Sequence, residues 1–167
     1  VQGLGYVGAV MAVVCANAIK DEYAVLGVDL PNRDSFWKIN SLNNGEFPLI
    51  AEDPKIEQYY RNALHKGNIY ATCDDYAYSH ADIVIVDIGL DVQITKSQNS
   101  EITEYDVSLS NFKNAIKSIA KKCKEDLLIL IETTVPPGTT EKIVKRINKT
   151  GVKKRGQTDE NNKIEQP

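Results

Sequence analysis

The sequence has few of the features that mark membrane-spanning, disulfide-bonded or nucleic-acid-binding proteins. No apolar run approaches the roughly 20 residues that a membrane-spanning helix requires. The net charge is −3 and the sequence pI is about 5.5, so the chain lacks the basic field that general affinity for nucleic acid usually needs. Neither nucleic acid nor a membrane is therefore expected as a partner.

Cysteine is scarce, since the chain has only Cys15, Cys73 and Cys123, far apart in the sequence. An odd number without a C-x-x-C pair predicts neither a disulfide framework nor a zinc site, so no metal is expected. A reducing, cytoplasmic compartment is the natural expectation. Cys15 lies in an apolar stretch and is expected to behave as a small apolar residue, whereas Cys73 follows a predicted strand at the edge of the predicted site.

What the sequence does contain is an alternation of apolar strands and helices. The chain has 167 residues, 42% of them hydrophobic, which is enough for one domain with a core. Strands are predicted over residues 24–30, 68–72, 83–88 and 127–131, with helices over 9–20, 53–65, 108–124 and 139–148. This order predicts an α/β fold with a doubly wound parallel sheet, Rossmann-like, whose ligand crevice lies at the carboxyl ends of the strands.

Two stretches fall outside this alternation. Residues 91–105 are polar and are predicted to form a long irregular loop of the kind often kept for function. Residues 151–167 are dominated by charged and amide side chains, so we expect a mobile tail behind a folded domain over 1–150.

A glycine loop opens the chain. Gly3-Leu4-Gly5-Tyr6-Val7-Gly8 is a G-x-G-x-x-G pattern, and Asp29 stands 21 positions beyond its last glycine. The pattern alone is weak, but a helix, a strand and an acid at this distance together indicate dinucleotide binding. Gly5 is expected to let a diphosphate approach the backbone, beside the positive end of the following helix. The alternative is a glycine-rich helix entry without a ligand.

Asp29 predicts which dinucleotide is bound. A carboxylate here accepts hydrogen bonds from the adenosine ribose and repels a 2′-phosphate, so NAD is favoured over NADP. Arg33 complicates this prediction, because an arginine just past the strand can host a 2′-phosphate or stack on adenine. The alternatives are that Asp29 is a cap or turn residue and that Arg33 is solvated.

The start of the chain leaves little room for a first strand. Only Val1 and Gln2 precede the loop, so most of the strand that should lead into it is expected to be missing. That strand is central in doubly wound sheets, and its loss exposes the backbone edges of both neighbours. We therefore predict that the chain is unstable or self-associating on its own.

A third group of residues follows the last predicted strand. Glu132 is followed by Thr133-Thr134-Val135-Pro136-Pro137-Gly138-Thr139-Thr140, which opens a helix. Hydroxyl groups at this place face the crevice and can donate to substrate oxygens or to water. For Thr139 and Thr140 the simpler interpretation is a helix cap, whereas Thr134 remains open between the two.

These motifs together resemble a known family. The glycine loop, the strand Ala81-Asp82-Ile83-Val84-Ile85-Val86 and the segment from Thr133 to Thr140 occur in the order and at the distances seen in the N-terminal NAD-binding domain of the UDP-glucose/GDP-mannose dehydrogenase family. The resemblance covers about residues 1–150. It implies a nucleotide-sugar 6-dehydrogenase, which oxidises the C6 alcohol of a UDP- or GDP-sugar to the uronic acid with two NAD, through a thiohemiacetal and a thioester on a cysteine.

The resemblance also assigns residues. It implies that NAD is bound by the loop and its surroundings, namely Gly3, Leu4, Gly5, Tyr6, Val7, Gly8, Asp29, Arg33 and Thr134. Thr134 matches the threonine of the family's Ser-Thr-Val-Pro segment. This match implies a catalytic role for Thr134 near the nicotinamide, where it helps to position a water.

The chain departs from the family in several ways. The family's nucleophilic cysteine, lysine and asparagine lie beyond a central helical domain, through which members commonly form homo-oligomers, and nothing here matches them. The usual Val-Pro-Thr-Pro is replaced by Ile88-Gly89-Leu90-Asp91, so Leu90 stands where a cofactor-binding threonine is usual. We expect the chain alone to be inactive. A stand-alone nucleotide-binding or regulatory module, or a dehydrogenase acting on hydroxy acids, remain the alternatives.

Overall fold

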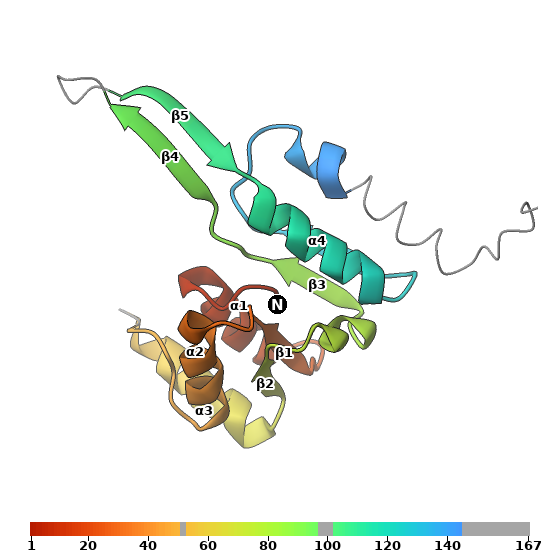
Figure 1. Cartoon of the computed structure of the whole chain (residues 1–167). Helices are drawn as coiled ribbons and strands as arrows, with labels where there is room; N and C mark the ends of the chain where they lie inside the picture. Colours follow the sequence, from red (N-terminus) through yellow and green to blue (C-terminus); the bar gives the residue numbers. More distant parts are fainter. Residues whose placement is uncertain (51–52, 97–101, 145–167) are drawn as a thin grey trace, which may run out of the picture.

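The computed structural model describes residues 1–50, 53–96 and 102–144 (Figure 1). The predicted tail over 151–167, and the end of the helix predicted over 139–148, lie outside the described residues. Within the described part of the chain, no helix has the length and apolar character needed to cross a membrane.

Four short strands form a parallel sheet. They are β1 (Val25–Val28), β2 (Ile69–Thr72), β3 (Ile83–Val86) and β6 (Leu128–Ile131). β1 pairs with β2 and β3 pairs with β6, both in parallel. Gln2 bridges the two pairs by contacting Val28 on one side and Val86 on the other. The order β2–β1–Gln2–β3–β6 confirms the predicted doubly wound parallel sheet.

The first three residues occupy the central position of the sheet, between β1 and β3. The Gln2 N–H donates to the Ile85 carbonyl at 2.7 Å, and the Gly3 N–H donates to the Val28 carbonyl at 2.8 Å. These bonds hold the glycine loop at the carboxyl end of the sheet. At the opposite end no described strand separates β1 from β3, and a cavity of about 550 Å³, here called the β1–β3 slot, lies between them.

Helices cover both faces of the sheet (Figure 1). They are α1 (Tyr6–Ala16), α2 (Arg33–Asn43), α3 (Pro54–Lys66), the 3-10 helix η1 (Asp75–Ser79), α4 (Ser110–Lys122) and the π-helical turn η2 (Thr140–Val144). On one face Phe112 and Ile116 of α4 are fully buried against Val86. On the other face Val13 of α1 packs in a core with Tyr60 of α3. α4 thus buries one side, as the periodicity over residues 108–124 predicts.

The helix predicted over 53–65 is confirmed as α3, and its local signals explain its ends. Asp53 caps it by accepting from the Lys55 N–H at 2.9 Å, and Pro54 occupies the first position, where its missing N–H costs nothing. Gly67 ends the helix in the left-handed conformation at φ 67°, which glycine adopts without strain.

The prediction of an irregular loop over residues 91–105 is wrong. Instead β4 (Asp91–Lys96) and β5 (Ile102–Ser108) form an antiparallel ribbon, with Val92 opposite Val107. The ribbon projects away from the parallel sheet (Figure 1). Val92 and Ile94 alternate with polar residues along β4, a period of two that is typical of a strand. The polar composition hid this pattern.

Candidate cofactor site

A crevice of about 830 Å³, here called the loop crevice, opens at the carboxyl ends of β1 and β3. The glycine loop forms its floor, Asp29 and Cys73 lie on the β1–β2 side, and Asp87 lies at the end of β3. From α4 it is lined by polar or small residues, namely Asn111, Asn114, Ala115 and Ser118. A crevice at this edge of a parallel sheet is where doubly wound folds bind ligands.

The three glycines of the loop differ in what surrounds them. A Cβ on Gly3, whose φ is +94°, would lie 1.8 Å from the Asp87 carbonyl oxygen. A Cβ on Gly8 would lie 2.0 Å from the Gly3 carbonyl oxygen. A Cβ on Gly5 would meet nothing within 4 Å. Packing of the protein itself therefore requires glycine at 3 and 8, whereas at position 5 the missing side chain leaves open space toward a ligand.

The first turn of α1 provides hydrogen-bond donors beside this space. Gly5 is the N-cap and has no side chain, and the first turn contains no acidic residue. Among the described residues nothing accepts a hydrogen bond from the Tyr6 or Val7 N–H. These free donors and the positive end of the helix dipole together suit an anion such as a diphosphate. The side chains of Tyr6 and Val7 are exposed, and that of Leu4 is fully buried.

Asp29 is held in place at the end of β1. Its Oδ2 accepts from the Leu4 N–H at 3.2 Å and from Lys38 Nζ at 2.9 Å, and its Oδ1 accepts from the Leu30 N–H at 2.8 Å. The side chains of Lys38 and Asp29 are 17% and 11% exposed. Sequence reasoning missed Lys38, which lies on α2 nine positions beyond the acid. Arg33, which it did single out, is exposed at the start of α2 and does not line the loop crevice, so its role stays a prediction.

Asp87 is a second carboxylate in the loop crevice that sequence reasoning did not identify. Burial raises the pKa of its carboxyl and the nearby Glu132 adds to this effect, while the Gly8 N–H opposes it by hydrogen bonding. An ionised carboxylate this close to the helix terminus is stabilised by one amide but weakly solvated. In the sequence, the only indication of this residue was an acid directly after the most clearly predicted strand.

The two adjacent threonines after β6 differ in their surroundings. Thr133 is buried, and its Oγ1 donates to the Val86 carbonyl at 3.2 Å and accepts from the Ile88 N–H at 2.8 Å. It therefore ties the end of β6 to the end of β3. Thr134 is exposed beside it but is not among the residues lining the loop crevice, and its catalytic role stays a prediction. Leu90 packs against the core under α4.

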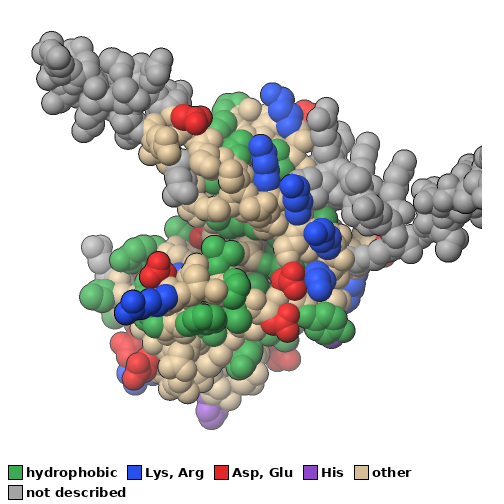
Figure 2. Space-filling view, viewed as in Figure 1, with side chains coloured by type: hydrophobic (Ala, Val, Ile, Leu, Met, Phe, Trp, Pro, Cys, Tyr) green, Lys and Arg blue, Asp and Glu red, His purple; other side chains and the backbone are tan. Residues whose placement is uncertain are grey.

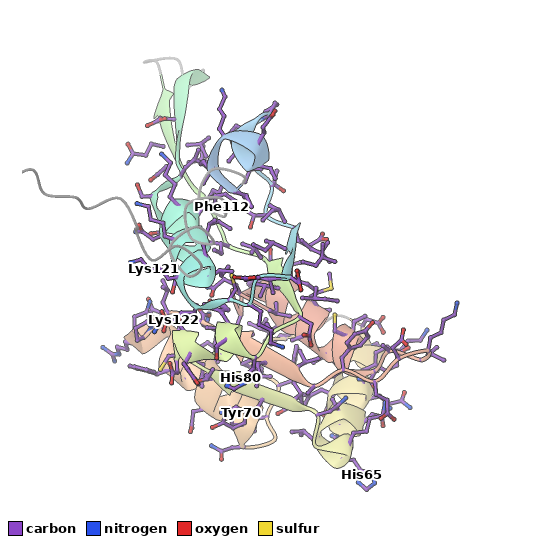
Figure 3. All side chains as sticks on the ribbon, turned by 90° about the vertical axis from the view of Figure 1, so that its right-hand side faces the viewer. His65, Tyr70, His80, Phe112, Lys121 and Lys122 are labelled. Atoms are coloured by element: carbon purple, nitrogen blue, oxygen red, sulfur yellow. The ribbon has the colours of Figure 1, made fainter. Side chains whose placement is uncertain are left out.

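The remaining candidates for chemistry are separated from the loop crevice. His65 lies at the end of α3 and His80 follows η1 (Figure 3), and neither lines the crevice. Cys123 is buried, and burial raises the pKa of the Cys15 thiol. Within residues 1–50, 53–96 and 102–144, no three acidic, histidine or cysteine side chains are grouped to hold a metal ion.

Positive charge gathers outside the crevice. The space-filling view shows Lys and Arg side chains in a line over α4 (Figure 2). The exposed lysines of α4 are Lys113, Lys117, Lys121 and Lys122. Lys121 and Lys122 leave the outer side of α4 (Figure 3), and Lys122 Nζ lies 3.7 Å from Asp75 Oδ1. Lys38 is the cationic side chain among the residues that line the described loop crevice.

A parallel sheet, a glycine loop at a helix N-terminus and an acid at the end of the next strand define a dinucleotide-binding α/β domain. Comparison with known proteins specifies the family. The profile of the UDP-glucose/GDP-mannose dehydrogenase family, NAD binding domain, matches residues 1–165. The chain belongs to this family, which confirms the resemblance seen in the motifs and identifies NAD as the cofactor. The predicted domain boundary at residue 150 stays a prediction.

Several dehydrogenases are similar to the chain. It is 29% identical over 156 residues to the UDP-N-acetyl-D-mannosamine dehydrogenase of Pyrococcus horikoshii, covering 92% of this chain and 32% of that protein. It is 27% identical to the UDP-glucose 6-dehydrogenase of Campylobacter jejuni, covering 90% of this chain and 34% of that protein. The chain thus spans about a third of the length of these relatives.

Solved structures agree with this assignment. The NDP-N-acetyl-D-galactosaminuronic acid dehydrogenase of Methanosarcina mazei Go1 superposes with a TM-score of 0.74 at 31% identity, covering 90% of this chain and 30% of that one. The Pyrococcus horikoshii UDP-D-ManNAc dehydrogenase gives a TM-score of 0.70 at 27% identity, and the match covers 91% of this chain and 32% of that one. The similarity extends through nearly the whole chain in both cases.

Proposed function

We propose that this chain is the NAD-holding part of a dehydrogenase that oxidises the C6 alcohol of a UDP- or GDP-sugar to the uronic acid with two NAD. The observation that carries the proposal is the open space at Gly5, beside the free Tyr6 and Val7 N–H groups and within the same crevice as Asp29. These are the groups that a diphosphate and a ribose require.

Each part of the loop crevice has a proposed task. The N–H groups of Tyr6 and Val7 bind the diphosphate, and the Asp29 carboxylate accepts from the adenosine ribose hydroxyls. Lys38 donates to Asp29 Oδ2 at 2.9 Å and so orients the carboxylate. This arrangement leaves Oδ1 to accept from the ribose hydroxyls. When bound, NAD supplies the acceptor for the hydride that leaves the alcohol carbon.

Thr134 is proposed to act near the reacting carbon. Its neighbour Thr133 fixes the backbone through the two hydrogen bonds of its Oγ1, which leaves the exposed Thr134 hydroxyl available to hold a water. Thr134→Val should lower kcat of the complete enzyme with little change in the affinity for NAD. Thr140→Val, which removes an exposed hydroxyl seven residues from Thr133, is the matched control.

The substrate is proposed from the relatives. Both the Pyrococcus horikoshii and the Methanococcus maripaludis relatives are UDP-N-acetyl-D-mannosamine dehydrogenases, so a UDP-linked N-acetylhexosamine is the first substrate to test. Nothing in this chain matches the family's nucleophilic cysteine, so we propose that oxidation, and assembly into a homo-oligomer, use segments other than those described. The chain alone is proposed to bind NAD without turning over sugar.

The test uses the complete protein that contains this chain. It is incubated with NAD and, in separate reactions, UDP-N-acetylmannosamine, UDP-glucose, GDP-mannose and simple 2- or 3-hydroxy acids, while NADH absorbance is followed. The proposal predicts two NADH for each nucleotide sugar consumed. Oxidation of hydroxy acids alone would contradict the substrate class, and NAD binding without reduction on any substrate would favour a regulatory module.

A further inference from the structure

Four aspartates line the loop crevice, and two of them, Asp29 and Asp87, stand directly after strands on either side of the glycine loop. The other two, Asp74 and Asp75, lie at the start of η1. Asp29 follows β1 and Asp87 follows β3, and these are the two strands that Gln2 joins. NAD has a matching pattern, because two ribose units flank its diphosphate. The proposed contact with the adenosine ribose uses only Asp29. The second carboxylate is therefore left without a role.

Backbone packing fixes the position of Asp87. Its N–H donates to the Gln2 carbonyl at 2.8 Å, and its own carbonyl oxygen lies where a Cβ on Gly3 would be. Its Oδ2 lies 3.1 Å from the place of a Cβ on Gly8. Glycine at position 8 thus makes room for the carboxylate directly above the first turn of α1. The Gly8 N–H also hydrogen-bonds to the carboxylate, which holds it on this side of the glycine loop.

The charges around Asp87 favour a neutral hydroxyl donor as its ligand. The ion pairs formed by the described residues involve Asp29, Glu57, Asp75 and Asp82, and none reaches Asp87. Glu132 lies near enough to raise its pKa further, and α4 offers no cation to the crevice. An acceptor-only group in this setting binds hydroxyl protons well and repels phosphate.

We infer that Asp87 accepts hydrogen bonds from the ribose on the nicotinamide side of NAD, as the counterpart of Asp29 on the adenosine side. This inference rests on the proposed binding of NAD in the loop crevice. It makes Asp87 a determinant of recognition for the second half of the dinucleotide, at a position that distinguishes NAD from ADP. The competing role is a helix cap that repels the diphosphate.

The experiment compares three ligands that share one end. ADP contains the adenosine ribose and the diphosphate, ADP-ribose adds the second ribose, and NAD adds the nicotinamide. Calorimetric titration should show that Asp87→Ala lowers the affinity for NAD and for ADP-ribose by about tenfold to a hundredfold, which is the range for a lost hydrogen bond to a charged group. The affinity for ADP should change by less than about twofold. Asp29→Ala should lower the affinity for all three ligands by a similar factor.

Two further variants keep the test decisive. Asp82→Ala, an acid near the start of β3 whose side chain is 87% exposed and pairs with Lys124, is the matched control and should change no affinity. Asp87→Asn keeps the shape and one acceptor, so it should give a smaller loss that is still selective for NAD over ADP even if the alanine variant folds poorly. Melting curves confirm that each variant is folded.

The outcomes separate the inference from the proposed function. Tighter binding of ADP and NAD alike in Asp87→Asn would show a repelling cap and overturn the inference. An equal loss for all three ligands would show a merely structural role and overturn it too. A folded wild-type protein that binds none of the three would overturn the proposed function itself, and the inference with it. A selective loss for NAD and ADP-ribose supports both.

Discussion

Replacing Gly5 by alanine separates the ligand-binding role of the glycine loop from its structural role. Gly5 has φ −74° and ψ −166°, which alanine adopts freely, and its added methyl group would meet no atom within 4 Å. The same change at Gly8 would place a methyl carbon 2.0 Å from the Gly3 carbonyl oxygen. The two substitutions are chemically identical and three residues apart, so each controls for the other.

The magnitudes follow from these contacts. At Gly5, alanine is a poorer N-cap by about 0.5–1 kcal/mol, but it restricts the unfolded chain and regains about 0.4–1 kcal/mol. The free energy of unfolding should therefore change by less than about 1 kcal/mol. At Gly8 the methyl group forces α1 away from the loop, and overpacking of this kind costs about 1–3 kcal/mol.

Binding should show the opposite order of effects. The methyl group of Gly5→Ala occupies the space through which the diphosphate reaches the Tyr6 and Val7 N–H groups. We expect the affinity for NAD to fall at least about tenfold, or about 1.4 kcal/mol. The assay is calorimetric titration with NAD, alongside urea unfolding of each variant. A Gly5→Ala protein of normal stability that binds NAD as tightly as the wild type would refute the proposed place of the diphosphate.

Three further predictions concern reactivity, pH and association. NAD should protect Cys73, which lines the loop crevice, from alkylation by iodoacetamide, whereas a rate unchanged by NAD would place the cofactor elsewhere. Burial raises the pKa of the Asp87 carboxyl above its ordinary value of 3.8, so just above that pH the native state binds a proton that the unfolded chain has released. The free energy of unfolding should then fall as pH rises through that window, and Asp87→Asn should flatten this dependence when unfolding is measured across pH. The β1–β3 slot exposes strand edges, so sedimentation should detect self-association of the folded chain, and a chain that stays monomeric would contradict this expectation.

The sequence predicted those elements whose signals are local. The β-branched run in β3, and the cap, proline and terminal glycine of α3, each specify their structure within a few residues. The ribbon of β4 and β5 was missed because the short alternation along β4 lies within a mostly polar stretch, and the strand is defined by its pairing with β5. Pairing of this kind is a tertiary property.

The candidate site was predictable to the same extent. The glycine loop and Asp29 form a spaced pattern that can be read along the chain, whereas Lys38 reaches Asp29 only because α2 folds back toward the end of β1. Asp87 looked like an ordinary residue after a strand, since its proximity to Gly8 depends on how α1 packs against the sheet. Thr134 was predicted from the resemblance to the family. The hydrogen bonds of its neighbour Thr133 could be seen only in the structure, because they join segments that are far apart in the sequence.

The central claim is that NAD lies on the glycine loop, with its diphosphate on the first turn of α1. Backbone amide resonances of the isotope-labelled chain, followed by NMR during titration with NAD, test it most directly. The account predicts that the Tyr6 and Val7 amide signals shift most, together with that of Leu4 beside Asp29, while those of α3 stay in place. A folded chain whose loop amides do not respond at millimolar NAD would contradict it.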